Sequence, residues 1–156
     1  MSKKPENALP VIENRKARHD YHIEDTLECG IVLTGSEIKV VRENRVSIAE
    51  GFCRVEENPP RLTLYQVHFG EYRPSGALGH KPIRARTLLA HKGEIRKIAR
   101  KMSKGMTIVP LKMYFKGAWA KVLIGIGSGK KAHDKRQAIK EKDAKREMQR
   151  AMSKRV

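Results

Sequence analysis

The basic side chains are the groups whose spacing most clearly indicates a chemistry, and that chemistry is phosphate binding. The segment from Gly129 to Val156 carries seven Lys and four Arg against two Asp and two Glu, so it contributes +7 to the formal net charge of +17. Its opening charged residues are Lys130, Lys131, His133, Asp134, Lys135 and Arg136. This charge density is typical of a polyanion-binding segment. The alternative is a solvated extension that only aids solubility.

Two further basic clusters lie before this tail, in a body that retains a net charge of +10. The first consists of Asn14, Arg15, Lys16, Arg18 and His19, and the second includes Arg84, Arg86 and Lys92. Together with the sequence pI near 10.2, they make nucleic acid the leading partner class. Binding to a membrane surface would require an apolar face rich in Trp, Phe and Leu, which the tail lacks.

Catalytic and metal-binding patterns are weak by comparison. The six His are scattered, and the two Cys are too far apart for a CxxC site or a disulfide framework. The acidic residues Glu24, Asp25 and Glu28 suggest a solvent face paired with Lys or Arg more than a nuclease-like acidic site. The glycines of residues 125–129 suggest a flexible exit into the tail. We therefore expect no enzymatic activity, metal, cofactor or small-molecule substrate.

The two cysteines and the single tryptophan are expected to have structural roles. We expect Cys29 and Cys53 to be small core residues, in a protein of the reducing cytoplasm, because no apolar signal segment is seen at the N-terminus. Trp119 follows a predicted turn, which favours packing at a strand start over a base-stacking role.

These side chains must be positioned by a predominantly β body. We expect a loose arm over residues 1–13, a body over 14–128 and a basic tail over 129–156. Period-two patterns predict strands at 21–33, 46–55, 62–69, 109–115 and 120–126. The first is expected to be irregular near Asp25 and again at Cys29–Gly30, and the second is expected to be irregular at Gly51. The second and third strands are expected to form a hairpin, as are the last two.

Helices are expected at three places. Thr34 and Glu37 form a capping-box pattern that starts a helix through about Arg42, with Ile38 and Val41 facing inward. A second helix is predicted from Leu88 to about Ser103, after an irregular loop at 70–82. The tail has a narrow apolar stripe that is marginal as an isolated helix and is expected to become helical when bound.

The order of these elements, five strands with a helix between the third and the fourth, is that of an OB-fold. We therefore predict a mostly β, OB-fold-like antiparallel barrel with two to three helices and a basic C-terminal tail.

The chain resembles the family of SsrA-binding proteins, also called small protein B, from about Asn14 to its C-terminus. The resemblance is carried by six ordered blocks at matching spacing. These blocks are Asn14–Tyr21, Glu28–Gly30, Leu33–Lys39, Arg84–Leu89, Val109–Leu111 and Gly129–Arg136.

The resemblance implies an OB-type barrel that binds the tRNA-like domain of transfer-messenger RNA (tmRNA) and enters stalled bacterial ribosomes in trans-translation. The tail would pass the small-subunit decoding centre into the empty mRNA channel. By the same resemblance, residues that contact or support the RNA surface are Asn14, Arg15, Lys16, Arg18, Glu28 and Leu89, and the tail motif is Asp134, Lys135 and Arg136. His133 could stack on a base, and Glu28 could bind base edges or orient a basic neighbour such as Arg18.

The sequence departs from the family pattern at three positions. Cys29 replaces a usual Ala, Thr87 replaces a usual Lys, and Ala132 replaces a larger residue. Two other readings stay open, namely an ordinary ribosomal or assembly protein with a basic tail, and an RNA-processing enzyme.

Overall fold

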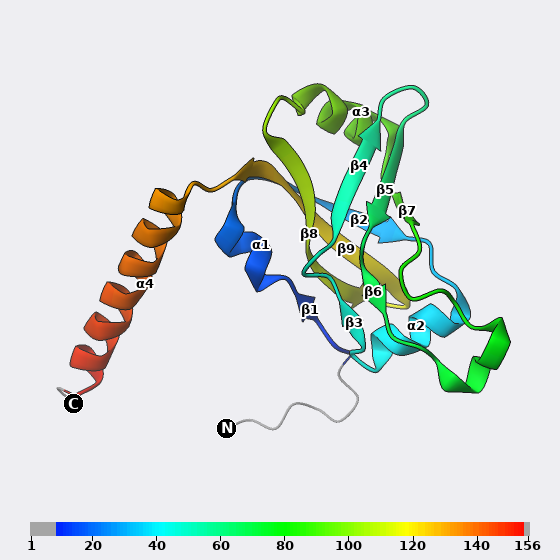
Figure 1. The fold of residues 1–156 in the computed structure, drawn as a ribbon, viewed down its shortest axis with the longest axis horizontal. Helices are drawn as coiled ribbons and strands as arrows, with labels where there is room; N and C mark the ends of the chain where they lie inside the picture. Colours follow the sequence, from blue (N-terminus) through cyan, green and yellow to red (C-terminus); the bar gives the residue numbers. More distant parts are fainter. Residues whose placement is uncertain (1–8, 155–156) are drawn as a thin grey trace.

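The computed structural model describes residues 9–154, except the side chains of residues 75, 77 and 78. Most of the arm predicted at 1–13 therefore lies outside the described residues, as do the last two residues of the tail. Within the described part, one large antiparallel sheet forms the body and a long helix leaves it at the C-terminal end (Figure 1).

The large sheet has seven strands in the order β1-β8-β4-β5-β7-β2-β9. Their bounds are β1 Ile12–Glu13, β2 Tyr21–Ile31, β4 Phe52–Glu56, β5 Arg61–Tyr65, β7 Arg86–Leu89, β8 Met106–Lys116 and β9 Trp119–Gly129. Because β8 also pairs with β9 over most of their length, the pairings close into a ring, as the prediction of a barrel requires. A second sheet joins β3 (Val46–Ser47) to β6 (His68–Phe69).

Two predicted strands are broken where the backbone turns. The strand expected at 46–55 divides into β3 and β4, since Gly51 closes a turn by donating its amide to the Ile48 carbonyl at 3.0 Å. A Cβ at Gly51 would lie 2.7 Å from Val67 Cγ2, so any side chain here would have to displace buried neighbours. The strand expected at 62–69 divides at Gln66, which has a positive φ of 60°. The hairpin predicted between the second and third strands is formed by β4 and β5.

The helix predicted from Leu88 was wrong in its first turn. Arg86 and Leu88 are buried while Thr87 and Leu89 are exposed, the alternation of strand β7, which pairs with both β5 and β2. Helix α3 begins only at Lys92 and ends at Lys101. The apolar spacing that suggested a helix in fact ran across the end of a strand.

The sequence also failed to reveal two short elements, β1 and helix α1 (Arg15–Asp20), which contain the first basic cluster. Asn14 is the N-cap of α1, where its side chain accepts the Ala17 amide at 3.0 Å. Its amide group also donates to the carbonyls of Ile48 at 3.1 Å and Pro110 at 2.8 Å. One buried asparagine therefore starts the helix and fixes it to the sheet.

The first long strand and the helix after it were predicted well. Strand β2 has an irregularity between Ile23 and Asp25, as expected, but the second break expected at Cys29–Gly30 was wrong, because the pairing with β9 continues through both residues. There a Cβ at Gly127 of β9 would lie 1.9 Å from the His22 carbonyl oxygen. Gly125 and Gly127 thus serve close strand packing inside β9, and the flexible exit expected there was wrong.

Helix α2 (Gly35–Arg42) begins with the predicted capping box, in which Thr34 accepts the Glu37 amide and Glu37 accepts the Thr34 amide. Val41 is buried as expected, but its buried neighbour is Val40, and Ile38 is only partly covered. The loop after β6 contains a short 3₁₀ segment, Arg73–Leu78.

Glu37 is fully buried and forms ion pairs with Arg86, also buried, and with Arg84. Arg86 lies with its guanidinium carbon 3.7 Å from the centre of the Phe69 ring. Burial disfavours the Glu37 carboxylate, but hydrogen bonds from the Thr34 amide, Arg84 and Arg86 outweigh it, so its pKa is lowered. This cluster joins α2, β7 and β6.

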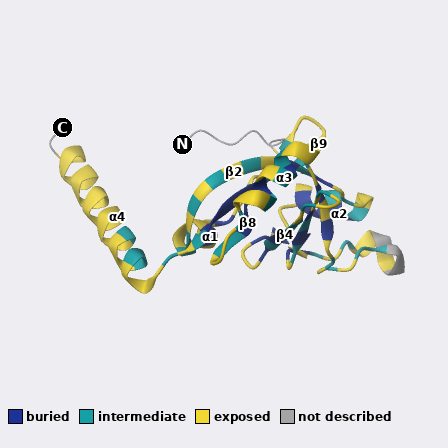
Figure 2. Cartoon of the chain, turned by 90° about the horizontal axis from the view of Figure 1, so that it is seen from above, coloured by how far each residue is buried: buried dark blue, intermediate teal, exposed yellow. Residues whose placement is uncertain are grey.

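The core inside the sheet is apolar and contains Cys29 and Cys53, as predicted (Figure 2). Burial raises the pKa of the Cys29 thiol to about 12 and that of Cys53 still further.

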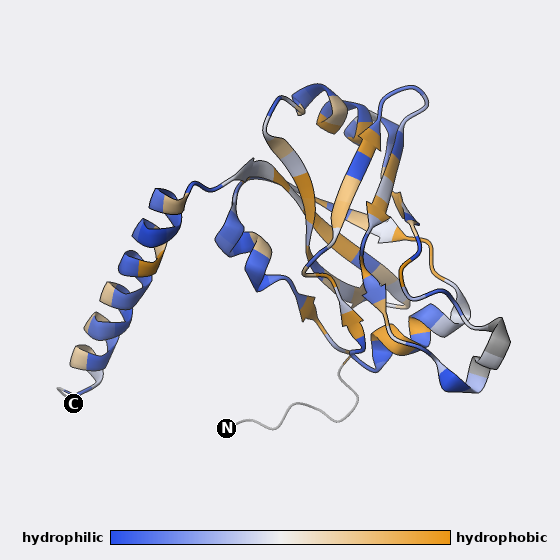
Figure 3. Ribbon diagram, in the orientation of Figure 1, coloured by the Kyte–Doolittle hydropathy of each residue, from blue (hydrophilic) through white to orange (hydrophobic). Residues whose placement is uncertain are grey.

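The tail forms helix α4 (Ala132–Ser153), none of whose residues is buried. It extends away from the body beyond the end of β9, and its surface is largely hydrophilic (Figures 1 and 3). Among the described residues, no helix is both long and apolar enough to cross a membrane.

The variant Glu37→Gln should lower the free energy of unfolding by about 3–5 kcal/mol at neutral pH, because it leaves a buried arginine without its counter-ion. Since folding lowers the pKa of Glu37 from its ordinary value of 4.5, its contribution is complete above that pH and is lost as the pH falls below it. Urea unfolding between pH 3 and pH 7, a range of about four units around that value, measures both effects.

The matched control is Glu43→Gln at the other end of α2, where an exposed carboxylate pairs with Arg45. It should change stability by less than about 1 kcal/mol. Equal losses in the two variants would contradict the structural role given to Glu37.

Candidate nucleic-acid interface

The first basic cluster is presented by one face of α1. Ala17 faces the core, whereas Arg15, Arg18 and His19 are exposed. Their i, i+3, i+4 spacing places them side by side on the helix. Lys16 lies elsewhere, with its amine 2.7 Å from Glu50 Oε1. Arg15, Arg18 and His19 are therefore available to an anion, and Lys16 is partly neutralised.

The α1 face also lines a cleft shared with the tail. This cleft has a volume of about 370 Å³, and Lys130, Ala138, Ile139 and Lys142 form its other side. Lys130 is tied to the end of α1 through its amide, which donates to the Asp20 carbonyl at 2.7 Å. The end of the body and the start of the tail are thus one continuous basic surface.

Two residues of the tail motif contact the body. Asp134 Oδ2 lies 3.3 Å from His22 Nε2, and Lys135 Nζ lies 3.1 Å from Asp20 Oδ1. The hydrogen bond from His22, joined by the Lys131 amide, lowers the pKa of Asp134. By contrast, Lys131, His133 and Arg136 are exposed on the tail. The motif therefore divides into residues that hold the helix to the body and residues that face solvent.

Glu28 lies further along β2, toward the end of the strand away from this junction. It lines a cleft of about 450 Å³ together with Gly30, Leu89, Ala90, His91, Glu94 and Lys121. Its carboxylate accepts hydrogen bonds from the Tyr114 hydroxyl and from Lys116, whose Nζ lies 3.4 Å away. The Tyr114 bond is the main cause of the lowered pKa of Glu28. Burial, followed by that same bond, raises the pKa of Tyr114 to about 12.

Glu28 therefore does not orient Arg18, as the sequence had suggested. Its partners are Tyr114 and Lys116, which both belong to β8. Leu89, also predicted, lines the same cleft and is 55% exposed. Of the acidic residues predicted to pair with cations, Asp25 lies 2.8 Å from Lys101 Nζ. The strand pattern predicted there could have identified Tyr114 and Lys116 as neighbours, since residues two apart in a strand point to the same face.

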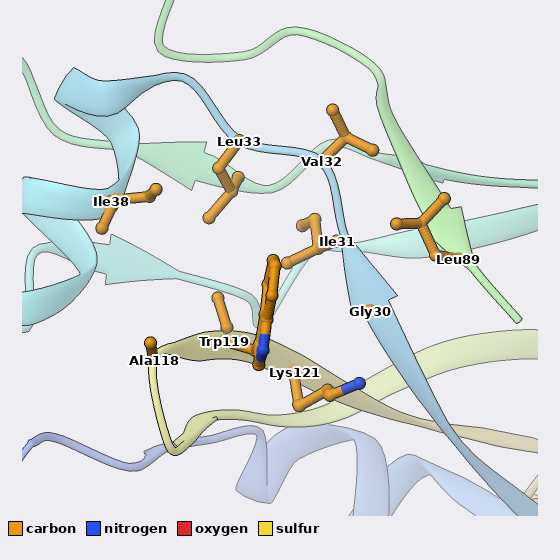
Figure 4. Close-up of a pocket in the computed structure, with 10 residues that line it drawn as sticks. Gly30, Ile31, Val32, Leu33, Ile38, Leu89, Ala118, Trp119 and Lys121 are labelled. Atoms are coloured by element: carbon orange, nitrogen blue, oxygen red, sulfur yellow. The ribbon is translucent and has the colours of Figure 1, made fainter.

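Next to the Glu28 cleft lies an apolar pocket of about 410 Å³, in which Trp119 stands free (Figure 4). Val32, Leu33, Ile38 and Leu89 surround it, and Trp119 is 75% exposed. The expectation that Trp119 packs at a strand start was wrong, because the β8–β9 turn carries it outside the core. An exposed aromatic ring beside Lys121 is available for stacking on a base.

The second basic cluster is less accessible than its sequence suggested. Arg86 is 1% exposed and engaged with Glu37, so it cannot meet an external phosphate, and its assignment as an RNA-binding residue is wrong. Arg84 shares the same carboxylate and is only partly exposed. Asn14, 2% exposed, supports α1 from below instead of contacting a ligand. Lys92 is exposed at the start of α3.

Among the residues that the structure describes, no group of three or more His, Cys, Asp or Glu is placed to hold a metal ion. The geometry consists of exposed cations, one exposed aromatic ring and open clefts, which is the chemistry of binding.

A family model described as SmpB protein matches residues 11–154. The chain belongs to the SmpB protein family. The matched range includes both the body and helix α4, and it confirms the resemblance carried by the six sequence blocks.

Close relatives extend the match to almost the whole chain. An SsrA-binding protein of Lactobacillus acidophilus is 48% identical over 151 residues, which cover 96% of this chain and 97% of the relative. An SsrA-binding protein of Chloroflexus aggregans is 48% identical over 158 residues, covering 100% of this chain and 99% of the relative.

A solved structure described as "tmRNA-SmpB: a journey to the center of the bacterial ribosome" superposes on this fold with a TM-score of 0.66. Its sequence identity is 42%, and the superposition covers 83% of this chain and 94% of that chain. The mostly β body with its helices is therefore that of an SmpB protein.

Matched substitutions should separate structural from ligand-binding arginines. Arg86→Met should lower the urea midpoint but leave the RNA affinity of the folded protein unchanged, because Arg86 is buried. Arg18→Met should change stability by less than about 0.5 kcal/mol and weaken binding, since an exposed cation is lost. Urea unfolding and fluorescence anisotropy with an RNA hairpin measure the two quantities. Weaker binding by folded Arg86→Met would contradict the assignment.

Proposed function

We propose that this chain binds tmRNA, the SsrA RNA, and acts with it on stalled bacterial ribosomes in trans-translation. The observation that carries the proposal is the family match over residues 11–154, which extends from the first basic cluster to the end of the tail helix. The names of the relatives and the description of the solved complex supply the partner class. The surface chemistry agrees, since exposed Lys and Arg outnumber exposed Asp and Glu among the described residues and Trp119 is exposed.

The division of the chain into an arm at 1–13, an RNA-binding barrel at 14–128 and a tail at 129–156 is part of this proposal. The barrel would contact the tRNA-like domain of tmRNA through the α1 face and the Glu28 cleft. Residues proposed for this contact are Arg15, Lys16, Arg18, His19, Glu28, Arg84, Leu89 and Lys92, with Asn14 as the support of α1.

Three residues absent from the sequence-based set join these, because they surround the Glu28 cleft or the apolar pocket. Lys121 lines both, Lys116 contacts Glu28, and Trp119 stands in the pocket. A cation and an aromatic ring beside a carboxylate can together bind a phosphate, a base face and a base edge. The cleft thus supplies contacts that a phosphate-binding cluster alone does not.

The tail would act on the ribosome, past the decoding centre of the small subunit and into the vacant mRNA channel. Helix α4 has 22 residues, which span about 33 Å at 1.5 Å per residue. Lys130, Lys131, His133 and Arg136 are the residues proposed for contact with ribosomal RNA, while Asp134 and Lys135 contact the body of the free chain. The role is that of an adaptor without enzymatic activity or cofactor, in the bacterial cytoplasm where ribosomes act.

The proposal is tested with a reconstituted bacterial translation system stalled on an mRNA without a stop codon. Addition of the purified chain together with tmRNA should permit peptide tagging, and omission of the chain should abolish it. Tagging that proceeds equally without the chain, or an absence of tmRNA binding in a gel shift, would refute the proposal.

The variant Glu28→Gln should weaken binding of the tRNA-like domain by about tenfold, because the loss of charge removes a strong acceptor from the cleft and frees Tyr114 and Lys116. Stability should be nearly unchanged, since Glu28 is exposed. Glu24→Gln on the same strand is the control and should bind as the wild type does. If Glu28→Gln lowers the melting temperature without changing affinity, the role of Glu28 is structural.

A further inference from the structure

The cleft between α1 and α4 has an unusual distribution of charge. Arg15, Arg18, Lys130 and Lys142 line it together with His19, and no carboxylate is among its lining residues. Several other cations of the described surface do have acidic partners, such as Lys16 with Glu50, Arg100 with Glu57 and Lys101 with Asp25. Four like charges thus face one another across one open cleft.

Two ion pairs beside the cleft nevertheless hold α4 against the body. The pairs Asp20–Lys135 and His22–Asp134 fasten the first turn of α4 to the body at 3.1 Å and 3.3 Å. Each pair is partly exposed to solvent, so each contributes little to stability. About two helical turns further along, repulsion between the cations of α1 and Lys142 opposes this weak attachment. The direction of α4 relative to the body is therefore set by a small balance of charges.

The orientation of α4 places Lys142 on the side that faces α1. Asp134, Ala138 and Lys142 are spaced i, i+4, i+8, so they share one face of the helix, and Asp134 is held by His22. Asp134 and Ala138 are partly covered, whereas residues 139–154 are all exposed (Figure 2). Lys140 lies two residues before Lys142, which places it on the other side of the helix.

We infer that the cleft between α1 and α4 binds phosphates of an RNA backbone, and that bound RNA fixes the direction of the tail helix. The inference deepens the proposed function and rests on it. Arginine and lysine side chains from two elements converge on the cleft, and a phosphodiester among them removes the repulsion that opposes docking of α4. The cleft volume of about 370 Å³ far exceeds the roughly 30 Å³ of one water, and Ala138 and Ile139 add apolar contact, so a stretch of polynucleotide fits better than a free ion.

This arrangement couples RNA binding to the position of the tail. RNA binds more tightly to the state in which α4 is docked, and by reciprocity it increases the population of that state. An RNA-bound chain thus presents its tail in one direction, whereas the tail of the free chain samples several.

The test is the distance between two spin labels measured by pulsed electron paramagnetic resonance on the full chain. Labels are attached at Glu56→Cys on β4 and Gln149→Cys on α4, both exposed positions. The native Cys29 and Cys53 are buried with raised thiol pKa values, so they compete little for the reagent. The distance distribution should be broad for the free chain and narrow when the tRNA-like RNA is added. Inorganic phosphate at the same phosphate concentration should leave the distance distribution broad.

Two substitutions of equal charge change make the test specific. Lys142→Glu places a carboxylate in the cleft, so its distribution should already be narrow without RNA, and its RNA affinity should fall about tenfold. Lys140→Glu lies on the other side of α4, so its distance distribution should be broad without RNA and narrow when RNA is added. Its RNA affinity should fall at most about threefold. Neither position is buried, so both variants should fold.

The outcomes separate this inference from the proposed function. If the labelled chain binds the RNA but its distribution stays broad, or if the two lysine variants behave alike, the cleft does not bind the backbone. Equal narrowing by inorganic phosphate would overturn the assignment to RNA in favour of a simple anion site. If the chain fails to bind the RNA at all, the proposed function itself fails and takes the inference with it.

Discussion

The buried carboxylate of Glu37 is the group on which the placement of the surrounding elements depends. Its oxygens accept hydrogen bonds from the Thr34 amide, Arg84 and Arg86, so a single side chain caps α2 and fixes the start of β7. Arg86 then donates to the carbonyls of Val67 and Lys81, which attaches the long loop before β7. A buried charge is tolerated only when its partners satisfy it, and here they do so from several elements.

This internal cluster also decides which residues reach the surface. Because Arg86 and Leu88 point inward, Thr87 and Leu89 must point outward, and Leu89 thereby enters the wall of the Glu28 cleft. Asn14 has a similar function on the opposite side of the barrel, since its amide group holds α1 against β8. The two proposed RNA-binding surfaces are thus each positioned by one buried polar residue.

Patterns local to the sequence predicted much of this fold. Alternation in β2, β8 and β9 and the capping box of α2 involve neighbours in sequence, and these elements were found. The irregularity at Gly51 was also predicted, because the turn there is closed by a local hydrogen bond to Ile48. The strand at Arg86 was missed, since its pairing with β2 and β5 is a long-range contact that no local pattern contains. The same limit explains the misassignment of Arg86, because a buried arginine and an exposed one look alike until Glu37 is placed beside it.

The exposure of aromatic residues and the partners of acidic residues were equally hard to predict from the sequence. Trp119 follows a turn whether it folds inward or stands free, and the closure of β8 on β9 decides between the two. The partners of Glu28 come from residues 114 and 116, and the contacts of Asp134 and Lys135 come from residues 20 and 22. Charge density predicted the class of partner well, since it depends on composition and not on contacts.

The central claim is that the body holds the RNA while the tail serves the ribosome, and a chain ending at Gly129 tests it most directly. Helix α4 buries no residue, so the truncated chain should melt within about 2 °C of the full chain. Its affinity for the tRNA-like RNA should fall by no more than about tenfold, because α1 and the Glu28 cleft remain. Peptide tagging on the stalled ribosome should be lost. Tagging that survives the truncation, or RNA binding that disappears with it, would contradict this division of labour.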